Sequence, residues 1–353
     1  MVEDRLRLSV VIPTFNGLAW LRRCLPRVLR YAPSGTEVIV VDDGSDDGTA
    51  RWIRSSGHAV RYIRRRTNGG FCAAVNDGIL AARAPLVETL NNDALVTPGW
   101  ADRPLELLSD PDVGAVAPLV LQLDRLGIVD SAGDGWHICG RAYSRFNNEP
   151  SMGDVLSGAE VFGVSACAAF YRREALLRAG LFPLRFGAYY DDVDLSFRMR
   201  YLGYRLLYCP QSVVLHAVHA SYGALTGSRL RRLARNEEWT FWRNTPRSLL
   251  PLALPMHVAY VFFHALSMAA RPRQAWAYLI GRLEALKEWG EVAEARARLP
   301  VRVPRAELAG RLKVDCSVLS FLEHVVRAAW RRAARPRVAS RGAEHGYQRR
   351  QAA

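Results

Sequence analysis

Lysine is almost absent from this 353-residue sequence, in which only two of the 48 basic residues are lysines. Closely spaced cysteines are absent altogether. Six cysteines stand at positions 24, 72, 139, 167, 209 and 316, and no two of them form a CxxC motif. This spacing excludes a zinc ribbon or a dithiol redox centre made from neighbouring thiols. We expect the cysteines to fill the core of a protein kept in a reducing compartment.

The N-terminus lacks the apolar stretch of a signal peptide. A short charged stretch, MVEDRLRL, leads directly into the apolar run SVVIP. Secretion is therefore not expected, and we predict a cytoplasmic protein.

Long apolar runs are rare as well, and the longest is interrupted by proline and histidine. Residues 249–270 are largely apolar, but Pro251, Pro255, His257 and His264 interrupt them. A membrane-spanning helix needs about 20 predominantly apolar residues. We expect a segment that lies in the membrane interface or re-enters it, rather than a simple span.

Positive charge is confined to the C-terminal third. Residues 1–227 hold 24 Arg and Lys and 24 Asp and Glu, whereas residues 228–353 hold 24 and 10, so the formal charge of +14 lies in the second segment. We therefore predict a domain over 1–227 and a basic helical extension over 228–353, with a disordered tail from about Arg331. Such an extension favours the anionic inner face of the cell membrane, although an Arg-rich proteome would give a similar solvated surface.

Short apolar runs alternate with helical patterns in the first ninety residues. Strands are expected at 6–12, 37–43, 59–65 and 85–93. Between them we expect a helix with Leu21, Leu25 and Val28 on one face, a helix through Ile53 capped by Ser45 or Asp46, and a helix within 68–82. Repeated β-α units predict an open, mostly parallel α/β sheet flanked by helices.

Polar clusters follow each of these strands. They read TFN, DDGSDDGT, RTNGG and NNDA in chain order. Ligands of open α/β sheets bind beyond the carboxyl ends of the strands. The four clusters therefore predict a single site for a phosphorylated ligand.

The middle of the chain is less periodic. We expect strands at 113–121, 165–171, 204–208 and 213–216, a Gly- and Asp-rich loop at 130–140, and a helix at about 191–202. After residue 227 the pattern becomes helical and basic.

Several motifs together resemble the family 2 glycosyltransferases of the GT-A fold, a Rossmann-like α/β fold, and especially their bacterial rhamnosyltransferase-like members. The matching segments span residues 8–222 and read SVVIPTFNG, VVDDGSDDGT, NGGFCAAVNDGI, LNNDA and YYDDVDLSFRMRYLGYRLLYCP, followed by VVLHAVHAS. The order and spacing of the segments carry the resemblance.

The resemblance implies a nucleotide-binding role for residues of the first three motifs. Asp43 would bind the base beside Asp42, because a carboxylate at a strand end can accept an imide N–H or ribose hydroxyls. Asn16 could also cap the following helix. The set implied to line or close the nucleotide pocket is Pro13, Thr14, Asn16, Asp42, Asp43, Asn68 and Gly70.

Asn92-Asp93-Ala94 stands where the family has a DxD-type metal motif, but only Asp93 is a carboxylate. Mg²⁺ and Mn²⁺ prefer oxygen ligands and accept several from substrate and water, so one or two protein ligands are enough. The resemblance implies Asn92 and Asp93 at the donor, and Asp93 with His216 on the cation. A buried, hydrogen-bonded histidine is the alternative for His216, which we rank above His219 as a ligand.

Asp191-Asp192-Val193-Asp194 resembles the family's acidic motif before a helix. An inverting transfer needs a carboxylate to take the proton of the acceptor hydroxyl, and we choose Asp192. Helical spacing predicts that Asp191 and Asp194 share one side while Asp192 lies on another. Asp191 is also assigned to the donor site, and first-turn acids near the helix dipole are its structural alternative.

The function predicted in this way is metal-dependent, inverting transfer of a sugar from a nucleotide-diphosphate donor to a glycan or lipid-linked acceptor in envelope polysaccharide synthesis. The alternative is a catalytically silent sugar-nucleotide sensor or membrane scaffold. A nucleotidyltransferase is disfavoured because IPTFNG lacks basic residues. We expect no nucleic-acid partner, because the tryptophans among the arginines occupy apolar helical positions.

Overall fold

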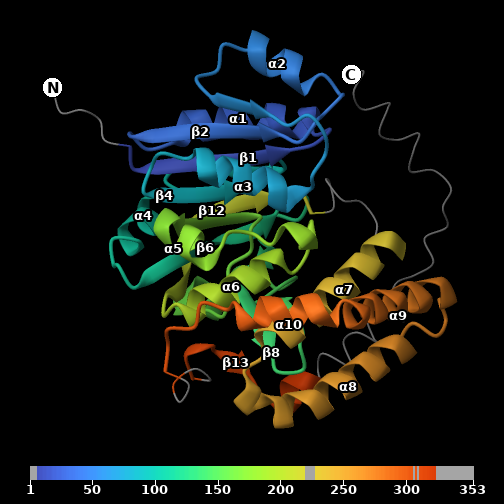
Figure 1. Ribbon diagram of the computed structural model, residues 1–353. Coiled ribbons are helices and arrows are strands. Elements are labelled where there is room, and N and C mark those ends of the chain that lie inside the picture. The colour runs from blue at the N-terminus through green and yellow to red at the C-terminus, as the bar shows by residue number, and fades with distance from the viewer. Residues whose placement is uncertain (1–5, 219–226, 305–306, 308–309, 323–353) are drawn as a thin grey trace.

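The computed structural model describes residues 6–218, 227–304, 307 and 310–322. It forms a mixed α/β structure with a large central sheet (Figure 1). The α/β fold expected from the sequence is therefore confirmed.

The strands of the central sheet run in the order β10-β12-β6-β11-β4-β1-β2-β3, with β5 paired to β12 and β7 to β6. Strands β1 to β4 run parallel to one another, and β6 runs parallel to β12, while β11 runs antiparallel between β4 and β6. Their bounds are β1 Leu8–Thr14, β2 Thr36–Asp42, β3 Arg61–Arg64, β4 Leu86–Leu90, β5 Ala94–Val96, β6 Val113–Gln122, β7 Val129–Ser131, β10 Ala159–Glu160, β11 Ala168–Arg172 and β12 Arg205–His216.

Helices cover both faces of this sheet. Alternate residues of β1 and β2 pack under α3, α5 and α6 on one face, and under α1, α2 and α4 on the other. A strand buried on both faces reads as a continuous apolar run, as β1 and β2 do. The bounds are α1 Leu18–Tyr31, α2 Thr49–Ser55, α3 Phe71–Ala81, α4 Asp102–Leu107, α5 Arg173–Ala179 and α6 Asp191–Tyr201, with 3-10 turns at Gly153–Leu156 and Leu184–Phe186.

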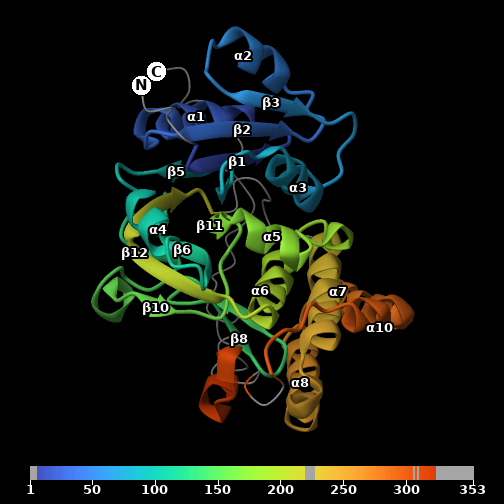
Figure 2. The same ribbon diagram turned by 60° about the vertical axis from the view of Figure 1, so that its left-hand side comes forward.

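Helices α7 to α10 gather at the end of the molecule opposite α2 (Figures 1 and 2). They are α7 Gly227–Asn244, α8 Leu250–Leu266 after a 3-10 turn at Arg247–Leu249, α9 Pro272–Lys287 and α10 Trp289–Ala297. A second sheet joins β8 Asp134–His137 and β9 Ala142–Ser144 to β13 Val314–Asp315. Trp239 of α7 also shares a core with the central sheet. The boundary at residue 227 stays a prediction, and the tail from Arg331 lies outside the described residues.

Three local expectations were wrong. The strands expected at 204–208 and 213–216 are one strand, β12, because an irregularity between Cys209 and Val213 shifts the register without ending the strand. Helix α2 begins after Gly48, whose left-handed φ of 92° suits glycine, and not after Ser45 or Asp46. Cys316 is exposed, whereas the other cysteines are buried or half-buried.

Glu88 is a fully buried carboxyl in β4, within the sheet. The indole Nε1 of Trp100 donates to both of its oxygens at 3.0 and 3.1 Å. Burial raises the pKa of Glu88 to about 8, although the Trp100 hydrogen bond opposes the shift. The side chain therefore folds as the neutral acid near neutral pH.

We expect Glu88→Gln to stabilise the protein at alkaline pH. Because the folded pKa is raised, the contribution of Glu88 to stability is full below about pH 4.5 and is lost as the pH rises toward about 8. The variant should have a free energy of unfolding on the order of 3 kcal/mol above wild type at pH 8.5, and no advantage near pH 4.5. Urea unfolding across this range measures the difference. Exposed Glu106, paired with Arg103, is the control for Glu→Gln, and an advantage of Glu88→Gln that does not change with pH would contradict the prediction.

Candidate functional site

The carboxyl ends of β1 to β4 meet, as the sequence predicts for parallel neighbours. Asn92, after β4, donates through Nδ2 to Thr14 Oγ1 at 2.8 Å and so ties β4 to β1. Asp43, after β2, accepts from the backbone N–H groups of Gly69 and Gly70 at 2.9 and 2.8 Å. These contacts bring the four polar clusters to one edge of the sheet.

A cavity of about 220 Å³ opens at this edge. Phe71 and Ala188 form part of its wall, and Arg232 of α7 reaches it from the C-terminal segment. Among the residues predicted for the nucleotide, six line it: Pro13, Thr14, Asp43, Asn68, Gly70 and Asn92.

Gly70 occupies a position that only glycine suits. Its φ is +85°, and an added Cβ would lie 3.3 Å from the carbonyl oxygen of Gly187. The Asp43 carboxylate holds the backbone at Gly69 and Gly70 in place, and it is itself paired with Arg65 Nε at 2.8 Å. Gly70 and Gly187 both line the cavity, so their backbones approach closely at its wall.

Asp42 and Asn16 do not line this cavity. Asp42 is fully buried, where it accepts from Ser45 N at 2.8 Å and from Tyr62 Oη at 2.5 Å. Asn16 Oδ1 accepts from Asp46 N at 2.9 Å, and no side-chain hydrogen bond caps α1. Both residues therefore shape the loops beside the cavity, and their direct contact with a ligand stays a prediction.

A second, larger cavity of about 540 Å³ adjoins the first, since Phe71, Asn91 and Ala188 line both. Its wall carries five carboxylates and a histidine: Asp93, Asp130, Asp134, Asp191, Asp192 and His216. Burial first, and the neighbouring Asp192 second, raise the pKa of Asp134 and of Asp191. So many acids around one cavity favour a bound cation.

Asp191 and Asp192 both line this cavity, whereas Asp194 points away from it. The prediction that Asp191 and Asp194 share one side, with Asp192 on another, was therefore wrong. Asp191 is the first residue of α6, and Tyr190 before it has a left-handed φ of 62°. The preceding turn therefore sets the direction of the Asp191 side chain. The regular spacing of 3.6 residues per turn does not predict directions reliably at the end of a helix.

Asp194 is a buried ion-pair centre between α6 and α7. Its carboxylate accepts from Arg198 Nε at 2.8 Å, from Arg243 at 2.9 and 3.0 Å, and from Asn244 Nδ2 at 2.9 Å. Although burial would raise the pKa of Asp194, Arg198 and Arg243 lower it. Its part is to join the two helices.

Asp192 is held by the backbone on both sides. Its Oδ2 accepts from Ala166 N at 3.1 Å and its Oδ1 from Val193 N at 2.9 Å. Burial raises the pKa of Asp192, and these hydrogen bonds oppose the shift. The carboxylate is therefore fixed in orientation and more basic than an exposed one, which suits proton transfer.

Asp93 and His216 face one another at the end of β12. His216 Nε2 lies 3.4 Å from Asp93 Oδ1, and Nδ1 lies 2.8 Å from Asp130 Oδ2. Burial would lower the pKa of His216, but Cys167, Asp130 and Asp93 raise it well above the usual value. The histidine is thus hydrogen-bonded as well as placed beside Asp93.

The pair fits two ligands of a small divalent cation. Two ligands at right angles on bonds of about 2.1 Å lie about 3.0 Å apart, close to the separation seen here. Within the described ranges, no group of three or more His, Cys, Asp or Glu side chains is arranged to hold a metal ion. The protein would therefore supply part of the coordination sphere only.

Sequence reasoning missed four charged residues of the two cavities: Asp130, Asp134, Arg229 and Arg232. The Gly- and Asp-rich character of residues 130–140 was a signal for the two acids. Nothing in the sequence points to the two arginines, because they resemble the rest of the basic α7. His219 lies outside the described residues.

Comparison with known proteins identifies the family of the N-terminal half. Residues 9–178 match the sequence profile of Glycosyl transferase family 2.

Residues 9–178 belong to glycosyl transferase family 2.

Two curated relatives illustrate how far the likeness extends. A pre-mycofactocin glycosyltransferase of Mycobacterium tuberculosis is 29% identical over 214 residues, which cover 59% of this chain and 42% of the relative. A Sinorhizobium fredii protein is 25% identical over 235 residues, covering 63% and 26%. The chain thus spans less than half the length of these relatives.

Solved structures confirm the GT-A fold of the family 2 domain. The mannosyltransferase PcManGT from Pyrobaculum calidifontis, in complex with GDP-Man and Mn²⁺, is 20% identical with a TM-score of 0.52, and the match covers 93% of this chain and 88% of that one. GalNAc-T7 with UDP, GalNAc and Mn²⁺ is 18% identical with a TM-score of 0.55, covering 85% and 59%.

We expect Asp194→Asn to destabilise the protein. It leaves Arg198 and Arg243 without their shared carboxylate, and Arg198 is only 3% exposed. Breaking one partner of a buried pair costs about 3–5 kcal/mol of unfolding free energy. Glu294→Gln, which removes the exposed pair with Arg298, should cost less than about 1 kcal/mol. Urea denaturation of both variants tests this difference, and equal losses would contradict it.

Proposed function

We propose that this protein is an inverting glycosyltransferase that moves a sugar from a nucleotide-diphosphate donor to a hydroxyl of a glycan or lipid-linked acceptor in envelope polysaccharide synthesis. The observation that carries the proposal is the pair of adjoining cavities. One is lined by strand-end polar groups suited to a nucleotide, and the other by Asp192 and the Asp93–His216 pair. A donor lying across their junction would present its sugar to Asp192.

The names of the similar structures support a sugar-nucleotide donor. PcManGT was solved with GDP-Man, and GalNAc-T7 with UDP and GalNAc. Donors to be compared for this chain are a UDP-sugar, a GDP-sugar and dTDP-rhamnose, the last because of the rhamnosyltransferase-like motifs.

Asp192 is the proposed general base. The acceptor hydroxyl attacks the anomeric carbon opposite the departing diphosphate, and Asp192 takes its proton. Direct displacement of this kind needs no covalent intermediate and inverts the anomeric centre. The backbone hydrogen bonds from Ala166 and Val193 hold the carboxylate in line for the transfer.

A divalent cation, Mn²⁺ or Mg²⁺, would be held by Asp93 and His216, with further ligands from the diphosphate and water. Bound there, it would stabilise the negative charge that develops on the leaving diphosphate. His216 would lose its proton on binding, because metal-bound imidazole is neutral. Both similar structures named above contain Mn²⁺.

Arg229 and Arg232 of α7 would add positive charge on the donor side. Arg232 lines the smaller cavity and Arg229 the larger one. A second source of positive charge would complement the diphosphate where the reduced NNDA motif supplies a single carboxylate for the metal.

The acceptor side is proposed to face the inner surface of the cell membrane. Helix α8 turns Ala253, His257 and Tyr260 into the protein and leaves Val258, Phe262 and Leu266 more than half exposed. Residues Arg247–Leu266 form a described helix long and apolar enough to cross a membrane, yet one of its faces is hydrogen-bonded to α7. If α8 lies along the membrane surface, its exposed apolar face contacts lipid while its other face keeps its hydrogen bonds to α7.

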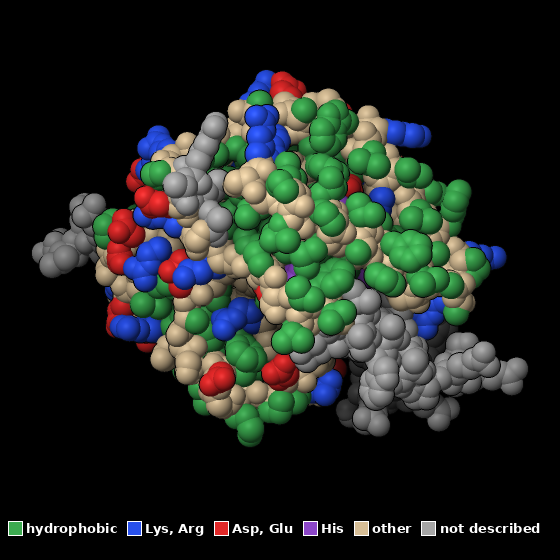
Figure 3. Space-filling model, turned by 90° about the horizontal axis from the view of Figure 1, so that it is seen from below, with side chains coloured by type: hydrophobic (Ala, Val, Ile, Leu, Met, Phe, Trp, Pro, Cys, Tyr) green, Lys and Arg blue, Asp and Glu red, His purple; other side chains and the backbone are tan. Residues whose placement is uncertain are grey.

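Helix α9 extends this apolar surface with Trp276, Leu279, Leu283 and Leu286, all at least 36% exposed. Viewed from the side on which α8 lies, hydrophobic side chains gather over a broad part of the face (Figure 3). Exposed apolar patches of this kind mark interaction sites. A cytoplasmic, peripheral location on an anionic membrane follows from the proposal.

Asp192→Asn should abolish turnover and spare donor binding. Loss of a general base lowers kcat about 10²- to 10⁴-fold. The purified protein is incubated with Mn²⁺, each donor in turn and membrane extract of the source cell, and released nucleoside diphosphate is measured. Calorimetric binding of the same donor with Mn²⁺ should change less than threefold.

A wild-type protein that binds a donor with Mn²⁺ but never turns it over would favour the alternative, a silent sensor or scaffold. Wild-type protein that binds none of the donors would overturn the proposed function.

Replacement of Val258 and Phe262 by Ser should weaken binding to vesicles that contain anionic lipid. Burying a large apolar side chain contributes about 1.5–3 kcal/mol, so the double variant should bind at least tenfold more weakly. Leu126 and Leu184 are at least as exposed but do not belong to α8 or α9, and their Ser variants are the matched control. Vesicle flotation at low and high salt measures binding. Equal flotation of the two pairs would contradict attachment through α8.

A further inference from the structure

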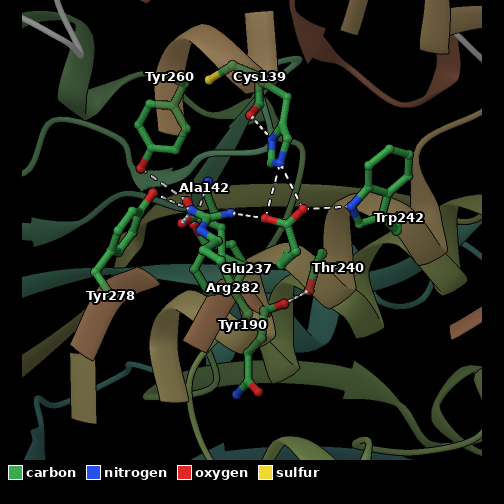
Figure 4. A network of polar contacts seen from close by, with 12 residues as sticks. Cys139, Ala142, Tyr190, Glu237, Thr240, Trp242, Tyr260, Tyr278 and Arg282 are labelled. Atoms are coloured by element: carbon green, nitrogen blue, oxygen red, sulfur yellow. Dashed lines mark hydrogen bonds and ion pairs between the residues drawn. The ribbon is translucent and has the colours of Figure 1, made fainter. Parts of the chain in front are cut away.

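A buried polar network links the turn at residues 187–190, directly before α6, to the C-terminal helices (Figure 4). It joins Tyr190, directly before α6, to Glu237 of α7, and Glu237 in turn to α8 and α9. Glu237 is buried, with 1% of its surface exposed, and Tyr190 is half-buried. The proposed reaction does not use any of these groups directly.

The backbone before α6 is strained. Gly187, Tyr189 and Tyr190 all have left-handed φ angles, of 70°, 70° and 62°. Two bulky L-residues in this region persist only where their surroundings hold them. The strained turn ends at Asp191 and Asp192, so its shape sets where both carboxylates point.

Helix α7 holds this turn through two adjacent residues. Asn236 Nδ2 lies within hydrogen-bonding distance of the carbonyl oxygens of Phe186, Ala188 and Tyr189, at 3.1, 2.9 and 2.9 Å. Glu237 Oε1 accepts from Tyr190 Oη at 2.7 Å. The backbone is thus fixed by Asn236 and the last side chain of the turn by Glu237.

The Tyr190 hydroxyl also accepts from the backbone N–H of Ala142, at 3.2 Å. Ala142 begins β9 and lines the larger cavity together with Tyr190. The Tyr190 hydroxyl therefore joins the turn before Asp191 to β9 and to helix α7.

Glu237 is itself held by the outer helices. Tyr260 of α8 donates to its Oε1 at 3.2 Å, and Arg282 of α9 pairs with its Oε2. Arg282 also pairs with Glu238 at 2.6 Å and donates to Tyr278 Oη at 2.8 Å. Charge-assisted bonds inside a protein are stronger than those at the surface, so the network couples these helices rigidly.

We infer that Tyr190 and Glu237 are positioning residues for Asp192, and that through Arg282 and Tyr260 they tie the geometry of the proposed base to helices α8 and α9. The inference rests on the proposed function for its catalytic consequence. Its structural part, the fixing of the turn by the Tyr190–Glu237 hydrogen bond, is independent of any reaction.

Tyr190→Phe is the first test, because it removes a single oxygen from the network. With the donor that supports turnover, kcat should fall ten- to hundredfold while the KM for the donor changes less than twofold. Glu237→Ala should lose at least as much kcat, because it also removes the contacts with Tyr260 and Arg282, and Glu237→Gln, which keeps an acceptor for Tyr190, should retain most of kcat. The losses should be less than additive in the double variant Tyr190→Phe, Glu237→Ala, since both changes remove the Tyr190–Glu237 bond.

The exposed ion pair of Arg231 with Glu284 offers a matched control. It also joins α7 to α9, at 2.8 Å between Arg231 Nε and Glu284 Oε2, but does not touch the turn. Glu284→Gln should leave kcat within twofold of wild type.

Amide hydrogen exchange provides a readout without turnover. In Tyr190→Phe, residues 187–194 should exchange at least tenfold faster than in wild type, and in Glu284→Gln they should not. Wild-type kcat and unchanged exchange in Tyr190→Phe would overturn the inference. A wild-type protein without turnover on any donor would instead count against the proposed function, while the exchange comparison would still decide the structural part.

Discussion

The first turn of α6 is the constraint on which the rest of the site depends. Three carboxylates within four residues must be kept apart in direction, because a buried carboxylate is tolerated only with partners or as the neutral acid. Asp194 receives two arginines and an asparagine, and so anchors α6 to α7. With that contact fixed, Asp191 and Asp192 are left facing the larger cavity.

Helix α7 makes the contacts that hold the start of α6 in place. It supplies Arg243 and Asn244 to Asp194 near one end, Asn236 and Glu237 to the turn before α6 in its middle, and Arg232 to the smaller cavity near its start. The basic C-terminal segment thus takes part in building the site. A segment that reads in the sequence as an appendage completes the wall of both cavities.

The parallel sheet positions the other half of the site. Because β1 to β4 are neighbours in the sheet, their ends converge, and hydrogen bonds such as Asn92 to Thr14 lock the loops together. The two cavities differ in the chemical groups that line them. Hydroxyl and amide groups line the smaller cavity together with Asp43 and Arg232. Acids line the larger one, and burial raises the pKa of three of them, Asp134, Asp191 and Asp192.

The family resemblance of the sequence pointed to Asp93, Asp192 and His216, whose roles stay predictions. The sequence by itself determined the α/β fold and the convergence of the polar clusters. These depend on local patterns and on the rule that parallel strand ends meet, which needs no knowledge of packing. Only the tertiary structure decided that Asp191 faces the cavity while Asp194 does not, that Asp42 is enclosed, and that Asp130, Arg229 and Arg232 reach the site. Each of these depends on contacts between segments far apart in the chain, such as Asp194 with Arg243, and on a left-handed turn at Tyr190 that α7 holds in place. Periodicity carries no information on such contacts, because it describes one element at a time.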